Sequence, residues 1–211
     1  MRISSQFDAG NIIVKDGSDP ADIRLKIRKD SGSDFYQWFF FRVTGAQGVV
    51  ARFVIENAGG AAYPQGWDGY QARMSCDLTD WGVVETAYED GRLIFETLIP
   101  EDSVWFAYFA PYTLARHYEL AAACQHASKA RLDVIGQTLD GRDLDRLTFG
   151  EAAPGKKTIW VTARQHPGES MAEWAAEGLL ERLADDYDPG ARELLSKAVV
   201  HVVPNMNPDG S

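Results

Sequence analysis

The sequence has few of the residues that build disulfide frameworks or cysteine metal sites. It contains two cysteines, Cys76 and Cys124, and four histidines in 211 residues. Two cysteines without CxxC spacing cannot form a disulfide framework, so we expect buried or incidental thiols in a reducing compartment.

Long apolar runs are also absent. Residues 1–20 carry charges such as Arg2, Asp8 and Lys15 and hold no apolar run of signal-peptide length. No other stretch approaches the ~20 apolar residues of a membrane span. We therefore expect a cytoplasmic protein without a membrane partner.

Positive charge is scarce: 21 Lys and Arg face 31 Asp and Glu, for a formal net charge of −10. Phosphate binding draws on clustered basic residues, which we do not find, so a nucleic-acid partner is excluded. Apolar residues make up 45% and aromatic residues 11% of the chain, which is ample for one large domain or two modest ones.

The N-terminal half alternates apolar and polar residues at the spacing of β-strands. In Asp22-Ile-Arg-Leu-Lys-Ile-Arg28, apolar and charged side chains alternate, which indicates one solvent-exposed and one buried face of the strand. About seven such strands without a long helix predict an antiparallel β-sandwich over residues 1–110. The expected strands are 22–28, 35–43, 49–56, 70–76, 82–88, 92–98 and 103–109.

Three local features refine this half. Asp90-Gly91 predicts a tight hairpin. The aromatic run from Phe35 to Phe41 is typical of a sandwich core and less so of a ligand platform. The glycine-rich segment 57–69, with Trp67, predicts a loop that could approach a partner surface.

After Pro111 the pattern changes to alternating strands and helices, which predicts an α/β domain over residues 111–211 with a mixed, largely parallel sheet. We expect a helix from Thr113 through about Ser128 and a hairpin around Asp140-Gly141. The other expected elements are strands 131–138, 143–149, 157–163 and 198–204 and helices 170–185 and 191–197. Expected buried helix faces comprise Leu114, Tyr118, Leu120 and Ala121, and then Met171, Trp174, Ala175 and Leu179.

His166 and Glu169 stand three residues apart where a predicted strand passes into a helix. Zinc binds His nitrogen and carboxylate oxygen, and Pro167 and Gly168 allow a bend that turns both side chains to one point. The loop from Asn207 to Gly210 follows the next predicted strand. Since ligands of such sheets lie beyond the carboxyl ends of the strands, both loops should open on the same rim.

No other histidine offers a clear third ligand. His117 and His126 lie on the first predicted helix and are most simply solvated, while His201 in the middle of a strand is typical of a satisfied core residue. The chain has no GxSxG elbow and no glycine-rich phosphate loop, so a serine hydrolase or nucleotide-binding enzyme is not indicated.

Two motifs together resemble the zinc carboxypeptidase family: Arg164-Gln-His-Pro-Gly-Glu-Ser170, and Val-Val-Pro204-Asn-Met-Asn-Pro-Asp-Gly210. The leading sandwich and the junction Tyr108-Phe-Ala-Pro-Tyr112-Thr resemble its cytosolic carboxypeptidase branch. The resemblance implies one zinc ion, bound by His166 and Glu169, and a peptide or protein C-terminus as substrate. It also implies that Arg164 orients these ligands without binding the metal itself, although an arginine at a strand end more often forms a surface ion pair.

In this family the third ligand, the substrate-binding arginines and the catalytic glutamate follow the Asn-Pro-Asp-Gly loop. The sequence ends at Ser211, so the resemblance implies no catalytic residue within these 211 residues. We therefore expect an α/β domain that is incomplete at its C-terminus, in the front part of a longer enzyme. By itself the chain should be inactive.

Two other functions stay open. Zinc deacylases of N-acyl amino acids also use an HxxE pair, and the chain could instead be a non-catalytic β-sandwich module for binding or assembly. Relatives in the cytosolic branch remove glutamates, but the net charge of −10 would repel a polyglutamate substrate. The sequence does not indicate an oligomeric state.

Overall fold

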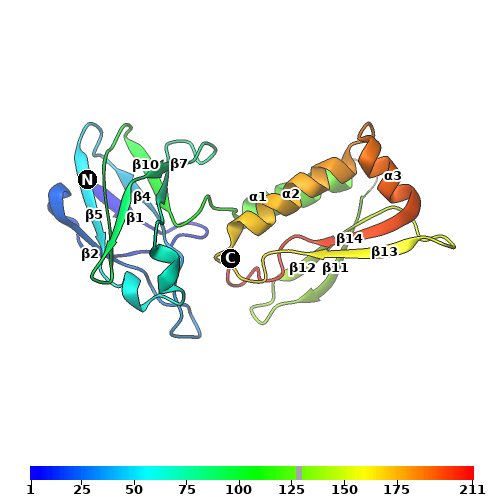
Figure 1. Ribbon diagram of the computed structural model, residues 1–211, viewed down its shortest axis with the longest axis horizontal. Coiled ribbons are helices and arrows are strands. Elements are labelled where there is room, and N and C mark those ends of the chain that lie inside the picture. Colours follow the sequence, from blue (N-terminus) through cyan, green and yellow to red (C-terminus); the bar gives the residue numbers. More distant parts are fainter. Residues whose placement is uncertain (127–129) are drawn as a thin grey trace. The chain divides into compact units, whose positions relative to one another are not determined.

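The computed structural model describes residues 1–126 and 130–211, which form two compact units, Met1–Pro111 and Tyr112–Ser211. The first unit contains two five-stranded sheets (Figure 1). The first sheet has the order β1 (Arg2–Ser4), β4 (Phe40–Thr44), β10 (Ser103–Ala107), β6 (Ala72–Ser75) and β7 (Gly82–Val84). The second has the order β2 (Ile13–Asp16), β3 (Ile23–Lys26), β5 (Val50–Ile55), β9 (Arg92–Leu98) and β8 (Thr86–Glu89). Three short 3₁₀ helices, η1 (Pro20–Asp22), η2 (Ala58–Gly60) and η3 (Pro64–Trp67), lie in the connections.

Aromatic rings join the two sheets face to face. Phe53 of β5 lies 5.6 Å from Phe41 of β4 and 4.9 Å from Phe106 of β10, between ring centroids. Phe95 of β9 contacts Phe106 from the same side at 5.7 Å. The predicted β-sandwich is therefore confirmed, with antiparallel pairing between the described strands of the first unit except between β3 and β5.

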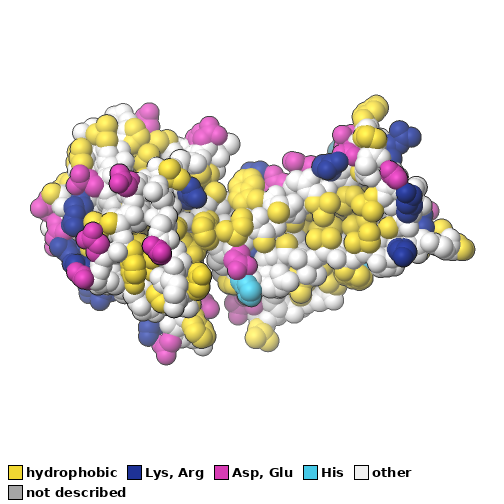
Figure 2. Space-filling model, viewed as in Figure 1, with side chains coloured by type: hydrophobic (Ala, Val, Ile, Leu, Met, Phe, Trp, Pro, Cys, Tyr) yellow, Lys and Arg dark blue, Asp and Glu magenta, His cyan; other side chains and the backbone are white. Residues whose placement is uncertain are grey.

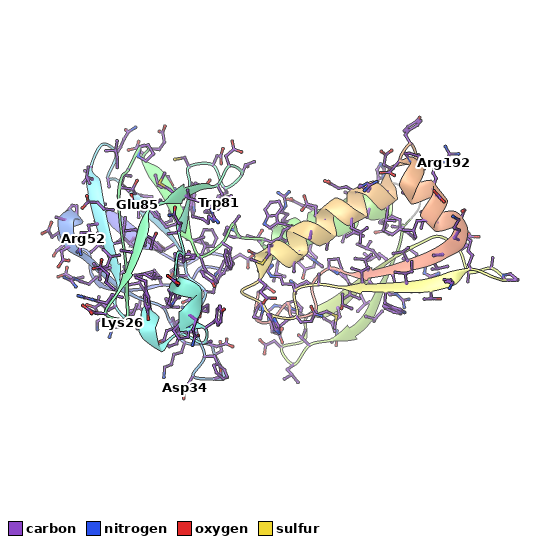
Figure 3. All side chains as sticks on the ribbon, viewed as in Figure 1. Lys26, Asp34, Arg52, Trp81, Glu85 and Arg192 are labelled. Atoms are coloured by element: carbon purple, nitrogen blue, oxygen red, sulfur yellow. The ribbon has the colours of Figure 1, made fainter. Side chains whose placement is uncertain are left out.

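Alternation of side chains explains why these segments form strands. In β3, Ile23 and Leu25 are fully buried while Arg24 and Lys26 are partly exposed. Lys26 is labelled in Figure 3, at the surface of this unit. Because side chains on a strand alternate with a period of two, the apolar pair points into the core and the charged pair points toward solvent.

Two predicted strands differ from the structure. The predicted strand 35–43 begins only at Phe40, although Phe39 and Phe41 are fully buried, as expected for core, and Phe35 is 70% exposed. The predicted strand 82–88 is divided at Glu85 (Figure 3), because β7 and β8 belong to different sheets. A change of sheet does not interrupt hydrophobic alternation, so the sequence pattern could not reveal it.

The prediction that the segment 57–69 could approach a partner surface stays a prediction, but Trp67 within it lies in the core of the sandwich. Its side chain is 1% exposed and its indole nitrogen donates a hydrogen bond of 2.8 Å to the carbonyl of Ala58. The rings of Tyr70 and Tyr108 lie 5.1 Å and 5.3 Å away. The indole therefore packs the glycine-rich segment against the core of the sandwich.

The hairpin prediction at Asp90-Gly91 is confirmed. Both residues have positive φ, 49° and 76°, which is the conformation of a type I′ turn between β8 and β9.

The second unit contains a four-stranded sheet of order β11 (Ala130–Gln137), β12 (Asp143–Phe149), β14 (Ala198–Val203) and β13 (Lys157–Thr162). Its helices are α1 (Leu114–His126), α2 (Ser170–Ala184) and α3 (Pro189–Lys197), which lie together on one side of the sheet in Figure 1. The predicted end of the first helix at Ser128 lies outside the described residues. None of the described helices is long and apolar enough to cross a membrane.

The sheet of the second unit is mixed, as predicted, but parallel pairing is confined to β13 and β14. Strands β11, β12 and β14 pair antiparallel, so the expectation of a largely parallel sheet is corrected. The hairpin of β11 and β12 accounts for the difference, since its second strand inserts beside β14. The turn of that hairpin lies at the predicted Asp140-Gly141.

A buried apolar cluster joins the helices to the sheet. Leu147, Phe149 and Val202 of the sheet are fully buried and pack in one cluster with Leu180 and Leu183 of α2. Figure 2 shows hydrophobic side chains gathered between α2 and the strands β13 and β14. This cluster holds α2 on the sheet just after the loop that contains His166.

The buried face of α2 differs from the prediction. It consists of Ser170, Glu173, Ala176, Leu180 and Leu183. Met171, predicted to be buried, is 44% exposed. Hydrophobic periodicity misplaced the face because a glutamate occupies one of its central positions.

We predict that Phe53→Ala lowers the free energy of unfolding of the first unit by about 3–5 kcal/mol, because a large cavity would remain among the three aromatic rings of Phe41, Phe95 and Phe106. Phe35→Ala is the matched control, since Phe35 is 70% exposed, and should change stability by less than about 0.5 kcal/mol. Urea unfolding of both variants measures the difference, and equal losses would contradict the role given to the ring cluster.

Candidate metal centre

The two predicted ligands lie close together on an exposed turn. The turn follows β13 and ends where α2 begins, and the amide of Glu169 donates to the carbonyl of His166 at 3.0 Å. His166 Nδ1 and Glu169 Oε2 are 3.1 Å apart, with side chains 78% and 55% exposed. Glu169 occupies the N-cap position of α2 without capping it through its side chain, so its carboxylate can bind another partner.

The separation of these donor atoms fits a shared zinc ion. Two donors bound to one ion at about 2.0–2.2 Å with a tetrahedral angle lie about 3.3–3.6 Å apart. The observed distance of 3.1 Å between His166 Nδ1 and Glu169 Oε2 would have to increase by only a few tenths of an ångström. Across residues 1–126 and 130–211, no group of three or more His, Cys, Asp or Glu side chains could hold a metal ion. The described part of the chain thus offers two ligands.

The turn of residues 165–169, which we call the ligand turn, is contacted by the loop after β14. Asn207 Nδ2 is 3.4 Å from the carbonyl of Gln165, and the amide of Met206 donates to the carbonyl of Ala163 at 2.9 Å. A Cβ atom on Gly210 would lie 2.7 Å from Cγ of Pro167, so glycine permits the close approach. The parallel pairing of β13 and β14 brings both loops to the same rim, as their order in the sequence predicts.

Asp209 ties this loop to the turn between β11 and β12. Its carboxylate accepts hydrogen bonds from Thr138 Oγ1 at 2.7 Å and from the amide of Asp140 at 3.1 Å. Arg142 adds an ion pair at 2.8 Å. Burial raises the pKa of the Asp209 carboxyl, but the hydrogen bonds to Thr138, Arg142 and the Asp140 amide together outweigh it and lower the pKa. Three contacts from one hairpin hold the loop at the rim.

Arg164 lies in the interior of the second unit. Its side chain is 1% exposed and forms an ion pair with Glu173 Oε2 at 2.7 Å. The guanidinium also donates to the carbonyls of Tyr112, at 2.6 Å, and Pro167, at 3.1 Å. The alternative of a surface ion pair at this strand end is therefore wrong. The residue contacts the ligand turn through Pro167, which lies between His166 and Glu169.

His117 was predicted to be solvated, which is wrong. The residue is 5% exposed, with Nδ1 2.7 Å from Glu173 Oε1 and Nε2 3.2 Å from Asp145 Oδ2. Burial lowers the pKa of the imidazole, but hydrogen bonds to the two carboxylates outweigh it and raise the pKa to about 9. The signal in the sequence was the helical spacing of His117 with Leu120, Ala121 and Cys124, which form the buried face of α1.

The remaining histidines and cysteines belong to no group of three or more potential metal ligands among residues 1–126 and 130–211. His201 Nδ1 hydrogen-bonds Thr148 Oγ1 at 2.9 Å, and its ring contacts Trp160 at 4.5 Å. Its interior position in β14 agrees with a structural role. His126 is exposed at the end of α1, as predicted. Cys76 is exposed and Cys124 is buried, and both are free thiols.

We predict that the stability of the second unit falls as the pH rises toward 9. The folded state binds a proton at His117 more tightly than the unfolded state, whose pKa is near 6.5. The protonated His117 contributes on the order of 3 kcal/mol to the free energy of unfolding. This contribution is fully present below pH 6.5 and is lost as the pH rises through about 9. Urea unfolding between pH 6 and 9 tests this, and His117→Gln should flatten the profile whereas His126→Gln should not. An unchanged profile in His117→Gln would contradict it.

We predict that Gly210→Ala separates the two loops, because the new Cβ atom would meet the stiff ring of Pro167 at 2.7–2.8 Å. The expected result is loss of the NMR cross-peak between residue 210 and the Pro167 ring, with a stability loss of about 1 kcal/mol. Gly178→Ala serves as control, since nothing lies within 4 Å of its Cβ position on α2. That substitution should raise stability by about 1 kcal/mol. A retained cross-peak in Gly210→Ala would refute the close contact.

Comparison with known proteins identifies both units. Residues 3–109 match the family model of the cytosolic carboxypeptidase N-terminal domain, and residues 117–211 match that of zinc carboxypeptidase. An uncharacterized protein of Zymomonas mobilis is 49% identical over all of this chain and 54% of its own length.

Solved structures agree with these matches. A metallo-carboxypeptidase from Burkholderia cenocepacia is 44% identical with a TM-score of 0.96, covering 100% of this chain and 57% of that protein. A metallo-carboxypeptidase from Pseudomonas aeruginosa, in complex with (2-guanidinoethylmercapto)succinic acid, is 43% identical with a TM-score of 0.95, covering 100% and 56%. The chain spans about half the length of these relatives. It belongs to the zinc carboxypeptidase family, with the N-terminal domain of the cytosolic carboxypeptidases.

Proposed function

We propose that this chain carries the first two zinc ligands, His166 and Glu169, of a metallocarboxypeptidase. The ligands lie in a zinc carboxypeptidase domain over residues 111–211, which follows a sandwich domain over residues 1–110. The observation that carries the proposal is the 3.1 Å approach of His166 Nδ1 to Glu169 Oε2 on an exposed turn. The turn that carries the pair also contacts the second motif of the family, since Asn207 Nδ2 lies 3.4 Å from the carbonyl of Gln165.

Bound zinc would polarise the scissile carbonyl and lower the pKa of a coordinated water toward about 7. His166 and Glu169 would hold the ion, and their high exposure leaves room for substrate and further ligands. The described residues contain no third ligand, so we propose that this ligand and the general base lie in the additional length that the relatives have. Without them the 211-residue chain should hydrolyse peptides at a negligible rate.

The proposed substrate is the C-terminus of a peptide or protein, and the proposed location is the cytoplasm. The complex of the Pseudomonas aeruginosa relative with a substituted succinic acid supports recognition of carboxylates in this family. The match to the N-terminal domain of cytosolic carboxypeptidases makes glutamate the first released residue to test. A net charge of −10 argues against long polyglutamate tracts, so single terminal residues are the better substrates to compare.

We predict that replacing both ligands, His166→Ala with Glu169→Ala, abolishes zinc binding by the chain. The wild-type chain should bind one Zn²⁺ weakly, because two protein ligands are fewer than the three of a catalytic site. Isothermal titration with Zn²⁺, supported by elemental analysis, measures the affinity. Matched controls are His126→Ala and Glu181→Ala, an exposed histidine and glutamate on α1 and α2, which should bind zinc as the wild type does.

The result that would overturn the proposal is equal zinc binding by the double variant and the wild type. For a longer product of the same reading frame, release of a free C-terminal amino acid from peptides ending in glutamate, arginine or leucine would support a carboxypeptidase. Cleavage of an N-acyl amino acid without such release would instead favour a deacylase. Unchanged function after both substitutions would favour a non-catalytic module.

A further inference from the structure

A network of buried charged side chains contacts the ligand turn, and Arg164 is its first member. The backbone of Arg164 is left-handed, with φ of 50°, a conformation that is strained for a non-glycine residue. This conformation turns the guanidinium into the interior, where it reaches the carbonyls of Tyr112 and Pro167 and the carboxylate of Glu173. The strained backbone is stabilised by contacts that only an inward guanidinium can make.

Glu173 is the second member and uses both carboxylate oxygens. Oε2 accepts from Arg164 at 2.7 Å, and Oε1 lies 2.7 Å from His117 Nδ1. The residue is fully buried and lies four positions after Glu169, one helical turn further along α2. Its carboxylate therefore connects the rigid start of α2 to the backbone of the ligand turn through Arg164.

His117 and Asp145 complete the network from α1 and β12. Nε2 of His117 lies 3.2 Å from Asp145 Oδ2, and both residues are less than a tenth exposed. With His117 protonated, two positive and two negative groups balance. Removing one member of such a buried set leaves an uncompensated charge, so the network resists changes in geometry.

The guanidinium adds to the contacts that the loop after β14 makes with the ligand turn at Gln165 and at the Pro167 ring. His166 and Glu169 are mostly exposed, and the carbonyl of Pro167 accepts a hydrogen bond from the guanidinium. That carbonyl lies between the two ligands in sequence. Its orientation bears directly on where both side chains point.

We propose that Arg164 and Glu173, supported by His117, are positioning residues that hold the ligand turn in the geometry that captures zinc. This inference rests on the proposed function of His166 and Glu169. Neither residue touches the ion: each acts through the Pro167 carbonyl and the start of α2. Ligands held by supporting contacts of this kind typically lose ten- to a hundredfold in metal affinity when the support is removed.

The test compares two glutamates on α2. Glu173→Gln removes the charge that holds Arg164, whereas Glu177→Gln removes a charge paired with Arg116 at 2.8 Å, one turn further from the ligands. Hydrogen exchange of the Glu169 amide, which is bonded to the His166 carbonyl, reports the turn without requiring metal. Zn²⁺ titration and thermal unfolding of the whole chain accompany it.

We expect exchange of the Glu169 amide to become at least about tenfold faster in Glu173→Gln, and Zn²⁺ affinity to fall about tenfold or more. Glu177→Gln should lose stability without either change. Equal exchange at Glu169 in the two variants would overturn the inference. If Glu173→Gln does not fold, Arg164→Lys provides the second variant, since lysine keeps the charge but cannot donate to three acceptors in the same way.

The failures of the two proposals can be told apart. If the chain does not bind Zn²⁺ through His166 and Glu169, the proposed function fails, while exchange at the Glu169 amide still reports whether the network orders the turn. If zinc binding requires both ligands but neither Glu173→Gln nor Arg164→Lys changes exchange or affinity, only the positioning role fails.

Discussion

The buried ion pair between Arg164 and Glu173 is the contact on which the candidate metal centre most depends. It joins the end of β13 to Tyr112 before α1, to the turn at Pro167 and to the start of α2, since one guanidinium donates to acceptors on three segments. Removing two charges from solvent costs free energy unless each is paired with an opposite charge. His117 and Asp145 extend this pairing into α1 and β12. The local backbone of the site is thereby linked to the core of the second unit.

Around this pair the fold brings two loops to one rim. Parallel pairing of β13 and β14 ends both strands at the same edge, and Gly210 allows the second loop to touch Pro167. Asp209 fastens that loop to the β11 and β12 turn. The exposed pair His166 and Glu169 is thus surrounded by rigid neighbours, which suits the proposed role of the pair in binding an ion beside a substrate.

Sequence patterns succeeded where the signal was local. Alternation in β3, the Asp90-Gly91 turn and the Asp140-Gly141 turn predicted elements that the structure contains, because each depends on neighbouring residues alone. They failed where a residue's partner is distant. Trp67 is buried although it lies in a glycine-rich loop. The buried helical faces were predicted from apolar residues alone, so the buried positions of His117 and Glu173 were missed.

The sequence by itself determined the two-part architecture, the HxxE pair, the Asn-Pro-Asp-Gly loop and the family, because these are carried by spacing and residue type along the chain. Only the tertiary structure decided that Arg164 turns inward, that His117 is charged between two carboxylates, and that β12 inserts antiparallel beside β14. The physical reason is desolvation. A polar side chain has the same sequence signature on the surface and in the core, and its role depends on which partners the fold brings to it once water is excluded.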